Sequence, residues 1–187
     1  MKMKRVLILF CVAGFVGWCL SGCDPIQSHS EIPEIGFKSL VFEDRIDTMG
    51  ILTKKAPILT FSFIDGDGDL GRSPEDVDRV SRIHYTWYQK LPDGTYVQHQ
   101  FPDGTITISP EIPYDEVMNK EGANNKTLKG TIEIVLIKPT NTQGVDIMRV
   151  EFFIVDRASN QSNVEYTPDF SILNPPEEPL LKTKAAK

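Results

Sequence analysis

The segment Arg149-Val150-Glu151-Phe152-Phe153-Ile154-Val155 decides the fold class of this chain, because its apolar side chains recur at every second position. The even-numbered side chains from Val150 to Ile154 are all apolar, and a period of two residues is that of a β-strand with one buried face. Residues 128–137 alternate in the same way. Both segments therefore predict half-buried strands of an antiparallel sheet.

Outward from this pair, shorter segments carry the same β signal between turn residues. They cover residues 36–43, 58–64, 82–88, 96–101, 105–109 and 164–167. The Pro-Asp-Gly sequences at 92–94 and 102–104 predict tight turns that join residues 82–109 into a three-stranded meander. About seven to eight short strands, with turn signals about every 8 to 12 residues, predict an all-β fold: an antiparallel β-sandwich of immunoglobulin-like architecture.

The N-terminus carries the features of an export signal. Three basic residues within the first five positions precede an apolar run, and small residues then lead to Cys23. The run is shorter than the roughly 20 residues of a membrane-spanning helix, which favours a cleaved signal over an anchor. The sequence Leu20-Ser21-Gly22-Cys23 resembles the lipobox of bacterial lipoproteins. This resemblance implies removal of residues 1–22 and attachment of lipid to Cys23, which would hold the mature chain on a membrane.

The cysteines leave the mature chain without a thiol. Cys11 and Cys19 belong to the signal and Cys23 carries the lipid, so no disulfide or cysteine-based zinc site can form. We therefore expect core packing to hold the fold. The expected organisation is a signal peptide 1–22, a lipidated N-terminus and flexible tether 23–34, a single β-sandwich domain 35–173 and a disordered C-terminal tail 174–187.

The charge of the mature chain excludes nucleic acid as an expected partner. Without the signal, 17 Lys+Arg remain against 26 Asp+Glu, which gives a formal charge of −9. Such a surface repels nucleic acid and anionic lipid head groups. The partners we expect are the membrane, reached through the lipid on Cys23, and an envelope protein or a glycan.

The loop Ile64-Asp65-Gly66-Asp67-Gly68-Asp69-Leu70-Gly71 is the segment most suited to chemistry. Carboxylates at alternate positions between glycines allow the chain to curl until Asp65, Asp67 and Asp69 converge. Two such charges about 4 Å apart repel each other by about 4 kcal/mol at an effective dielectric constant near 20. A hard cation would remove that repulsion, and calcium suits oxygen ligands better than zinc or copper. The loop therefore predicts a calcium site.

This loop departs from the EF-hand pattern. Leu70 stands at the sixth position, where an EF-hand has glycine, and Asp76 stands at the twelfth, where it has glutamate. A strand-flanked calcium loop is the better hypothesis, with Asp76 or Asp78 as further ligands. The alternative is a solvated turn, in which the aspartates and glycines supply only backbone geometry.

The segment Asp156-Arg157-Ala158-Ser159-Asn160 follows the decisive strand. It resembles the Asp-x-Ala-Gly-Asn turn found before the last strand of many bacterial immunoglobulin-like repeats, with Ser159 where glycine is usual. The favoured interpretation is a turn in which Asp156 and Asn160 bond their own backbone. The functional alternative adds the Asp156 carboxylate to the calcium site, which requires the ends of two strands to lie side by side.

Four aromatic residues fall on one predicted hairpin: Tyr85, Trp87, Tyr88 and Tyr96. We expect them in the core, because aromatic side chains usually dominate burial. If some of the rings instead faced outward, they would suit stacking on sugar rings.

Several segments together resemble the small uncharacterised lipoproteins common in the Bacteroidetes. These segments are Ile35-Gly36-Phe37, residues 63–71, Asp156-Arg157 and Ser162-Asn163-Val164. The resemblance covers roughly residues 18–170, and the acidic loop is its most specific part. It implies an envelope lipoprotein with a β-sandwich, which we place in the outer membrane, and it supplies no activity.

Two classes of function remain. The first is a non-catalytic binding or assembly module, tethered by its lipid, with calcium fixing its loops. The second is a polysaccharide hydrolase that uses loop carboxylates such as Asp65 or Asp69. The sequence contains no Gly-x-Ser-x-Gly, no His-Glu-x-x-His and no phosphate-binding glycine loop, although its many acidic residues leave a carboxylate pair for glycoside hydrolysis open. We therefore expect a protein that is not an enzyme.

Overall fold

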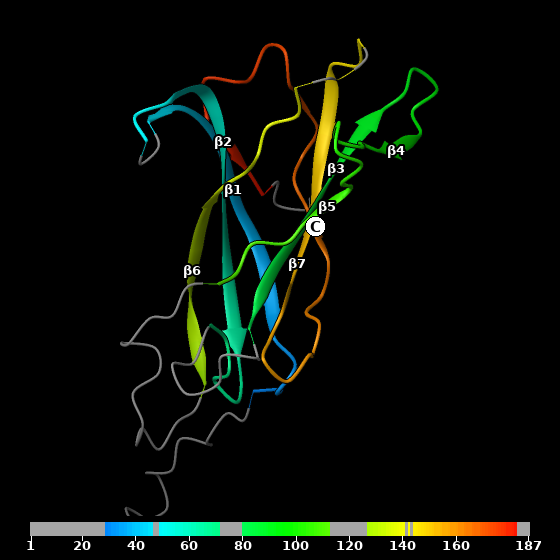
Figure 1. Ribbon diagram of the computed structural model, residues 1–187. Helices are drawn as coiled ribbons and strands as arrows, with labels where there is room; N and C mark the ends of the chain where they lie inside the picture. Colours follow the sequence, from blue (N-terminus) through cyan, green and yellow to red (C-terminus); the bar gives the residue numbers. More distant parts are fainter. Residues whose placement is uncertain are drawn as a thin grey trace, which may run out of the picture.

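The computed structural model describes residues 29–46, 49–71, 80–112, 127–140, 142 and 144–182. Within them, two antiparallel sheets face each other as the predicted β-sandwich (Figure 1), which confirms the fold class. The first sheet has the order β10-β1-β2-β6 and consists of β1 (Glu34–Ile46), β2 (Leu52–Asp65), β6 (Leu128–Val135) and β10 (Leu180–Leu181). No helix in this described part is long and apolar enough to cross a membrane.

The second sheet has the order β4-β3-β7-β8, with β5 also paired to β3 and β9 also paired to β7. Its strands are β3 (Arg82–Lys90), β4 (Tyr96–Gln98), β5 (Thr107–Ile108), β7 (Ile147–Val155), β8 (Glu165–Tyr166) and β9 (Phe170–Ser171). The strands beyond the expected seven to eight are two-residue pairings near the C-terminus. They are too short to leave a periodic signal in the sequence.

The alternation that predicted the strands places their apolar side chains between the sheets. On β7, Val150, Phe152 and Ile154 are completely buried. On β6, the even-numbered side chains face the core and the odd-numbered ones are exposed. The rings of Phe61 on β2 and Phe152 on β7 lie 5.3 Å apart across the interface. Burial of each such side chain stabilises the fold by about 1.5–3 kcal/mol.

Strand β1 changes its buried face part-way along its length. Ile35 and Phe37 are buried near its start, whereas Leu40 and Phe42 are buried further on. A β-bulge between Phe37 and Ser39 shifts the register with β2 by one residue. The bulge therefore keeps the apolar side chains inward although the sequence alternation breaks.

The predicted meander is wrong, because β4 and β5 do not pair with each other. Both lie along the same edge of β3, with Gln98 opposite Tyr88 and Thr107 opposite Thr86. Between them the chain makes a small loop, closed by a bond from the N–H of Phe101 to the carbonyl of Thr105 at 2.8 Å. The loop is too short for a strand pair, so the chain returns to satisfy the open edge of β3.

The aromatic residues of this hairpin divide between two faces. Tyr85 and Trp87 are buried in the core as expected. Tyr88 and Tyr96 lie on the outer face instead, where the guanidinium of Arg149 approaches both rings. The alternation of β3 requires this, because Tyr88 follows the inward-facing Trp87.

The expectation of a disordered tail from residue 174 is corrected for its described part. Leu180 and Leu181 form β10 and pair with Leu40 and Ser39 of β1. The ammonium of Lys182 lies 3.0 Å from the carboxylate of Glu165. The pairing of β10 with β1 covers an edge of β1 that would otherwise present unpaired backbone groups.

Candidate metal centre

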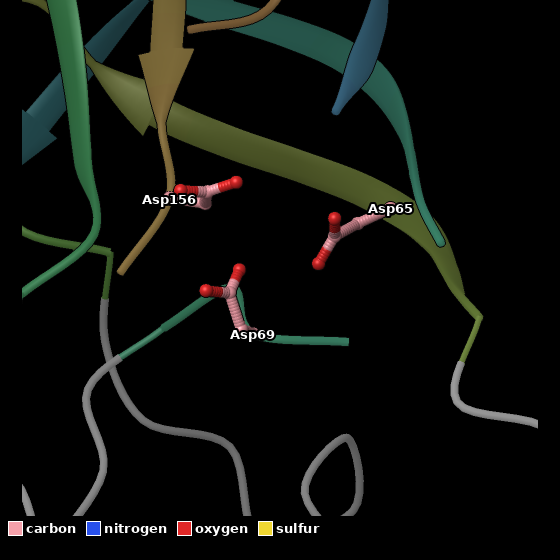
Figure 2. Close-up of side chains that lie close together, drawn as sticks. All are labelled: Asp65, Asp69 and Asp156. Carbon is pink, nitrogen blue, oxygen red and sulfur yellow. The ribbon is translucent and has the colours of Figure 1, made fainter. Parts of the chain in front are cut away.

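Three carboxylates meet at one end of the sandwich (Figure 2). Asp65 is the last residue of β2, Asp69 lies in the loop that follows, and Asp156 comes directly after β7. Each offers an oxygen that lies within 4.8 Å of the other two, and the three side chains point toward a common space. Because β2 and β7 belong to opposite sheets, the cluster bridges the two layers.

The loop after β2 curls back over the strand end for local reasons. Gly68 and Gly71 have φ angles of 72° and 90°, which glycine adopts without the strain that other residues would meet. Leu70 is buried in the core and its N–H donates to Oδ2 of Asp65 at 3.2 Å. The burial of Leu70 therefore brings Asp69 back toward Asp65.

Asp69 is also bonded to the segment that follows β7. Nε of Arg157 donates to the carbonyl of Asp69 at 2.7 Å, and the N–H of Ala158 donates to its Oδ2 at 2.9 Å. The acidic loop and the end of β7 are thus joined at one residue.

Asp156 forms the self-bonded turn that the sequence favoured, and its carboxylate also lies close to Asp65 and Asp69. Its Oδ1 accepts the N–H of Asn160 at 2.7 Å and its Oδ2 accepts Nδ2 of Asn160 at 3.0 Å, as expected of a self-bonded turn. Ser159 has a φ of 71° in this turn, which explains why glycine is usual at that position. The same Asp156 carboxylate belongs to the three-carboxylate cluster.

Burial and like charge raise the pKa of two of these carboxyl groups. Burial, followed by the charges of Asp67 and Asp69, raises the pKa of Asp65 from 3.8 to about 7. Burial, followed by the charges of Asp156 and Asp67, raises the pKa of Asp69 to about 6. Without a bound ion, Asp65 therefore keeps its proton to a higher pH than an exposed aspartate does.

Some oxygens of this cluster lack a partner. With the carboxylates ionised, Oδ1 of Asp65, of Asp69 and of the neighbouring Asp67 is buried and has no hydrogen-bond partner among the described residues. A proton on Asp65 would be shared with Asp67. A buried polar atom without a partner is costly and rare in native proteins. A cation between these oxygens would supply the missing interaction and offset the repulsion between the charges.

The five predicted metal ligands fall into three groups. Asp65, Asp69 and Asp156 come together. Asp67 is outside this trio, although its charge raises the pKa of Asp65 and Asp69. Asp76 lies outside the described residues, as do Asp78 and the predicted lipidation site Cys23.

Sequence reasoning missed the contacts that fix the incoming chain beside the cluster. The carboxamide of Asn163 accepts the N–H of Ile35 at 2.8 Å and donates to its carbonyl at 3.0 Å. The N–H of Gly66 donates to the carbonyl of Ser30 at 2.9 Å. Asn163 belongs to a segment that the sequence singled out, but its partner lies 128 residues away and left no local signal.

No family model, curated protein or solved structure matches this chain. The chemistry of the site therefore has to be inferred from its own geometry.

Proposed function

We propose that this chain is an outer-membrane lipoprotein, anchored by lipid on Cys23, whose β-sandwich binds calcium and acts as a non-catalytic binding or assembly module for an envelope protein or a glycan. The observation that carries the calcium site is the cluster of Asp65, Asp69 and Asp156, whose oxygens lie within 4.8 Å of one another. The lipobox and the resemblance to Bacteroidetes lipoproteins support the location.

The ligand chemistry favours calcium over other metals. The described candidate ligands are all carboxylate oxygens, which are hard donors. His84 and His99 take part in other contacts, with Ser109 Oγ and the Phe101 ring respectively. Calcium accepts about 6 to 8 oxygens in irregular arrangements, whereas magnesium requires a near-octahedral set. An irregular loop with several free oxygens fits the first requirement better.

Burial of the carboxylates favours an ion over a sugar as their ligand. A catalytic acid must come within about 3 Å of the glycosidic oxygen. Asp65 is 0% exposed, so a polysaccharide does not reach it in this conformation, and the partly exposed Asp69 would have to act without it as a second catalytic acid. For this reason we prefer the binding module to the hydrolase.

Thermal unfolding with calcium or chelator tests the ion site. Extracellular modules bind calcium with a Kd of about 10⁻⁴ to 10⁻³ M, so calcium at about 1 mM should add about 0.4 to 1.4 kcal/mol to the free energy of unfolding. For a domain of this size that raises Tm by about 1 to 5 °C. Asp69→Asn should abolish the shift, because it removes a ligand charge and keeps an acceptor for the N–H of Ala158.

The matched control is Asp103→Asn. Asp103 caps an exposed turn through a bond from the N–H of Thr105 at 2.9 Å, and asparagine can accept the same bond. This variant should show the full calcium shift. A Tm that ignores both calcium and chelator, or a shift that survives in Asp69→Asn, would refute the calcium site.

A further inference from the structure

Three tyrosine rings lie close to one arginine on the outer face of the second sheet. Cζ of Arg149 lies 3.6 Å from the ring centroid of Tyr96, 4.6 Å from that of Tyr166 and 5.7 Å from that of Tyr88. The four residues, here called the Tyr-Arg row, come from the neighbouring strands β4, β3, β7 and β8. Neighbouring strands are about 4.8 Å apart, so the row is about 14 Å long.

Arg149 has donors to spare. Its side chain makes no hydrogen bond within the described part of the chain, and its Nε is buried without a partner. Its side chain is half-buried, and its two terminal nitrogens are not among the buried polar atoms that lack a partner. A guanidinium has five N–H donors and normally meets a carboxylate or carbonyl. The terminal nitrogens are therefore available to an incoming acceptor.

Acceptors lie beside these donors. Asp169 receives bonds from Nζ of Lys90 at 2.7 Å and from the hydroxyl of Tyr96 at 2.8 Å. Glu151 receives a bond from the hydroxyl of Tyr166 at 2.7 Å. Each carboxylate keeps further lone pairs for a ligand. Two cations and two anions thus balance on this face, and its net charge is zero.

We propose that the Tyr-Arg row binds a neutral polysaccharide. Sugar rings have apolar faces that match flat tyrosine rings, and their hydroxyls both donate and accept hydrogen bonds. Tyr166, which is 42% exposed, would stack on a sugar ring, whereas the guanidinium of Arg149 already covers one face of Tyr96. Arg149 would donate to sugar oxygens, and Asp169 and Glu151 would accept from sugar hydroxyls. A balanced local charge offers no advantage to an acidic glycan, and charges further away are screened beyond about 8 Å at physiological salt.

This inference rests on the proposed function, because it names the ligand class of the binding module. It uses a different part of the molecule from the carboxylate cluster. Arg149 and Asp156 stand at opposite ends of β7, about 23 Å apart at the usual rise of a strand. Glycan binding and calcium binding can therefore be measured and lost separately.

Native gel electrophoresis through soluble polysaccharides tests the proposal, with the full chain in a sugar-free nonionic detergent. The probes are starch, mixed-linkage β-glucan, xyloglucan and galactomannan, with polygalacturonate as the anionic comparison. At least one neutral probe should retard the protein. Tyr166→Ala and Arg149→Ala should each weaken the retardation at least about tenfold, because each removes a group that touches the sugar.

Arg82→Ala is the matched control. Arg82 lies on β3 of the same sheet. Its guanidinium pairs with the carboxylate of Glu111 at 3.5 Å, outside the Tyr-Arg row. This variant should migrate like the unchanged protein. Tyr166 is 42% exposed, so its variant should stay folded, and a cooperative thermal transition at a nearly unchanged Tm should confirm that.

Three results would overturn the proposal: no retardation by any neutral probe, retardation by polygalacturonate alone, or unchanged retardation in folded Tyr166→Ala. If retardation is absent while the calcium shift is present, the glycan proposal fails and the calcium site stands. If the calcium shift is absent while retardation is present, the calcium site fails and the glycan proposal stands.

Discussion

A single carboxylate, Asp65, has opposite effects on the fold with and without a cation. Without one, its burial and its charged neighbours favour the protonated form, and its pKa rises to about 7. With one, the ionised form becomes a ligand and the proton must leave. Stability and calcium affinity should therefore depend on pH in opposite directions.

In chelator, the free energy of unfolding should fall as the pH rises from about 4 to about 7. Asp65 and Asp69 titrate near 3.8 when unfolded but at about 7 and about 6 when folded. In this window the folded state binds more protons than the unfolded state, so its advantage is complete below pH 3.8 and lost as the pH rises through the folded values. Calcium affinity should instead weaken at least about tenfold from pH 8 to pH 5.5, because protons compete for the ligands.

Tm measured against pH in chelator, and calorimetric calcium titrations at the two pH values, check this prediction. Asp65→Asn is the informative variant, because it cannot ionise and should flatten the part of the Tm profile near pH 7. A metal-free Tm that rises over this window would show that the carboxylates are not repelling one another.

At the scale of elements, Gly66 holds the acidic loop against the incoming chain. A Cβ on this residue would lie 2.2 Å from the carbonyl oxygen of Ser30 and 2.4 Å from that of His29. Both are backbone atoms, which cannot turn aside as a flexible side chain would. Gly66→Ala should therefore displace the segment before β1 and destabilise the fold by about 1–3 kcal/mol.

Hydrogen exchange of residues 29–36, together with Tm, measures this effect. Gly36→Ala is the control, because its Cβ would meet only the movable Oγ of Ser62 at 3.1 Å. We expect faster exchange in Gly66→Ala and nearly unchanged exchange in Gly36→Ala. Equal protection in both variants would mean that the contact between Gly66 and Ser30 does not hold the segment.

Sequence reasoning succeeded where one element carries its own signal. β6 and β7 have one buried face each, and their alternation revealed both. It failed where the partner decides the structure: the pairing of β5 with β3 depends on an open strand edge, and the two-residue β10 exists because β1 offers a second one. The site divides in the same way. The spacing of Asp65 and Asp69 suggested a cluster, whereas the arrival of Asp156 required the opposing sheet.

At the scale of the whole molecule, the carboxylate cluster lies where the chain enters the domain. Ser30 bonds Gly66 and Ile35 bonds Asn163, both next to the cluster. Only residues 24–29 therefore separate the predicted lipid on Cys23 from the first fixed contact at Ser30, and these seven steps along the chain reach at most about 23 to 25 Å. Under the proposed function, calcium strengthens the end nearest the membrane, and the Tyr-Arg row lies about 23 Å further along β7.

Under the proposed function this arrangement depends on the lipid, so Cys23 would decide where the whole molecule resides. Cys23→Ser replaces the sulfur that would form the thioether and should abolish incorporation of labelled palmitate. Cleavage should also fail, which leaves a precursor 22 residues longer than the mature chain. Cys19→Ser is the matched control, because Cys19 is expected to leave with the signal, and this variant should be labelled and processed normally. Label that persists in Cys23→Ser, or that disappears in Cys19→Ser, would place the modification elsewhere.

One acyl chain binds a membrane with an affinity of only about 10⁴ M⁻¹. Stable retention of the unchanged protein in the membrane fraction therefore also requires that Cys23 carry more than one chain.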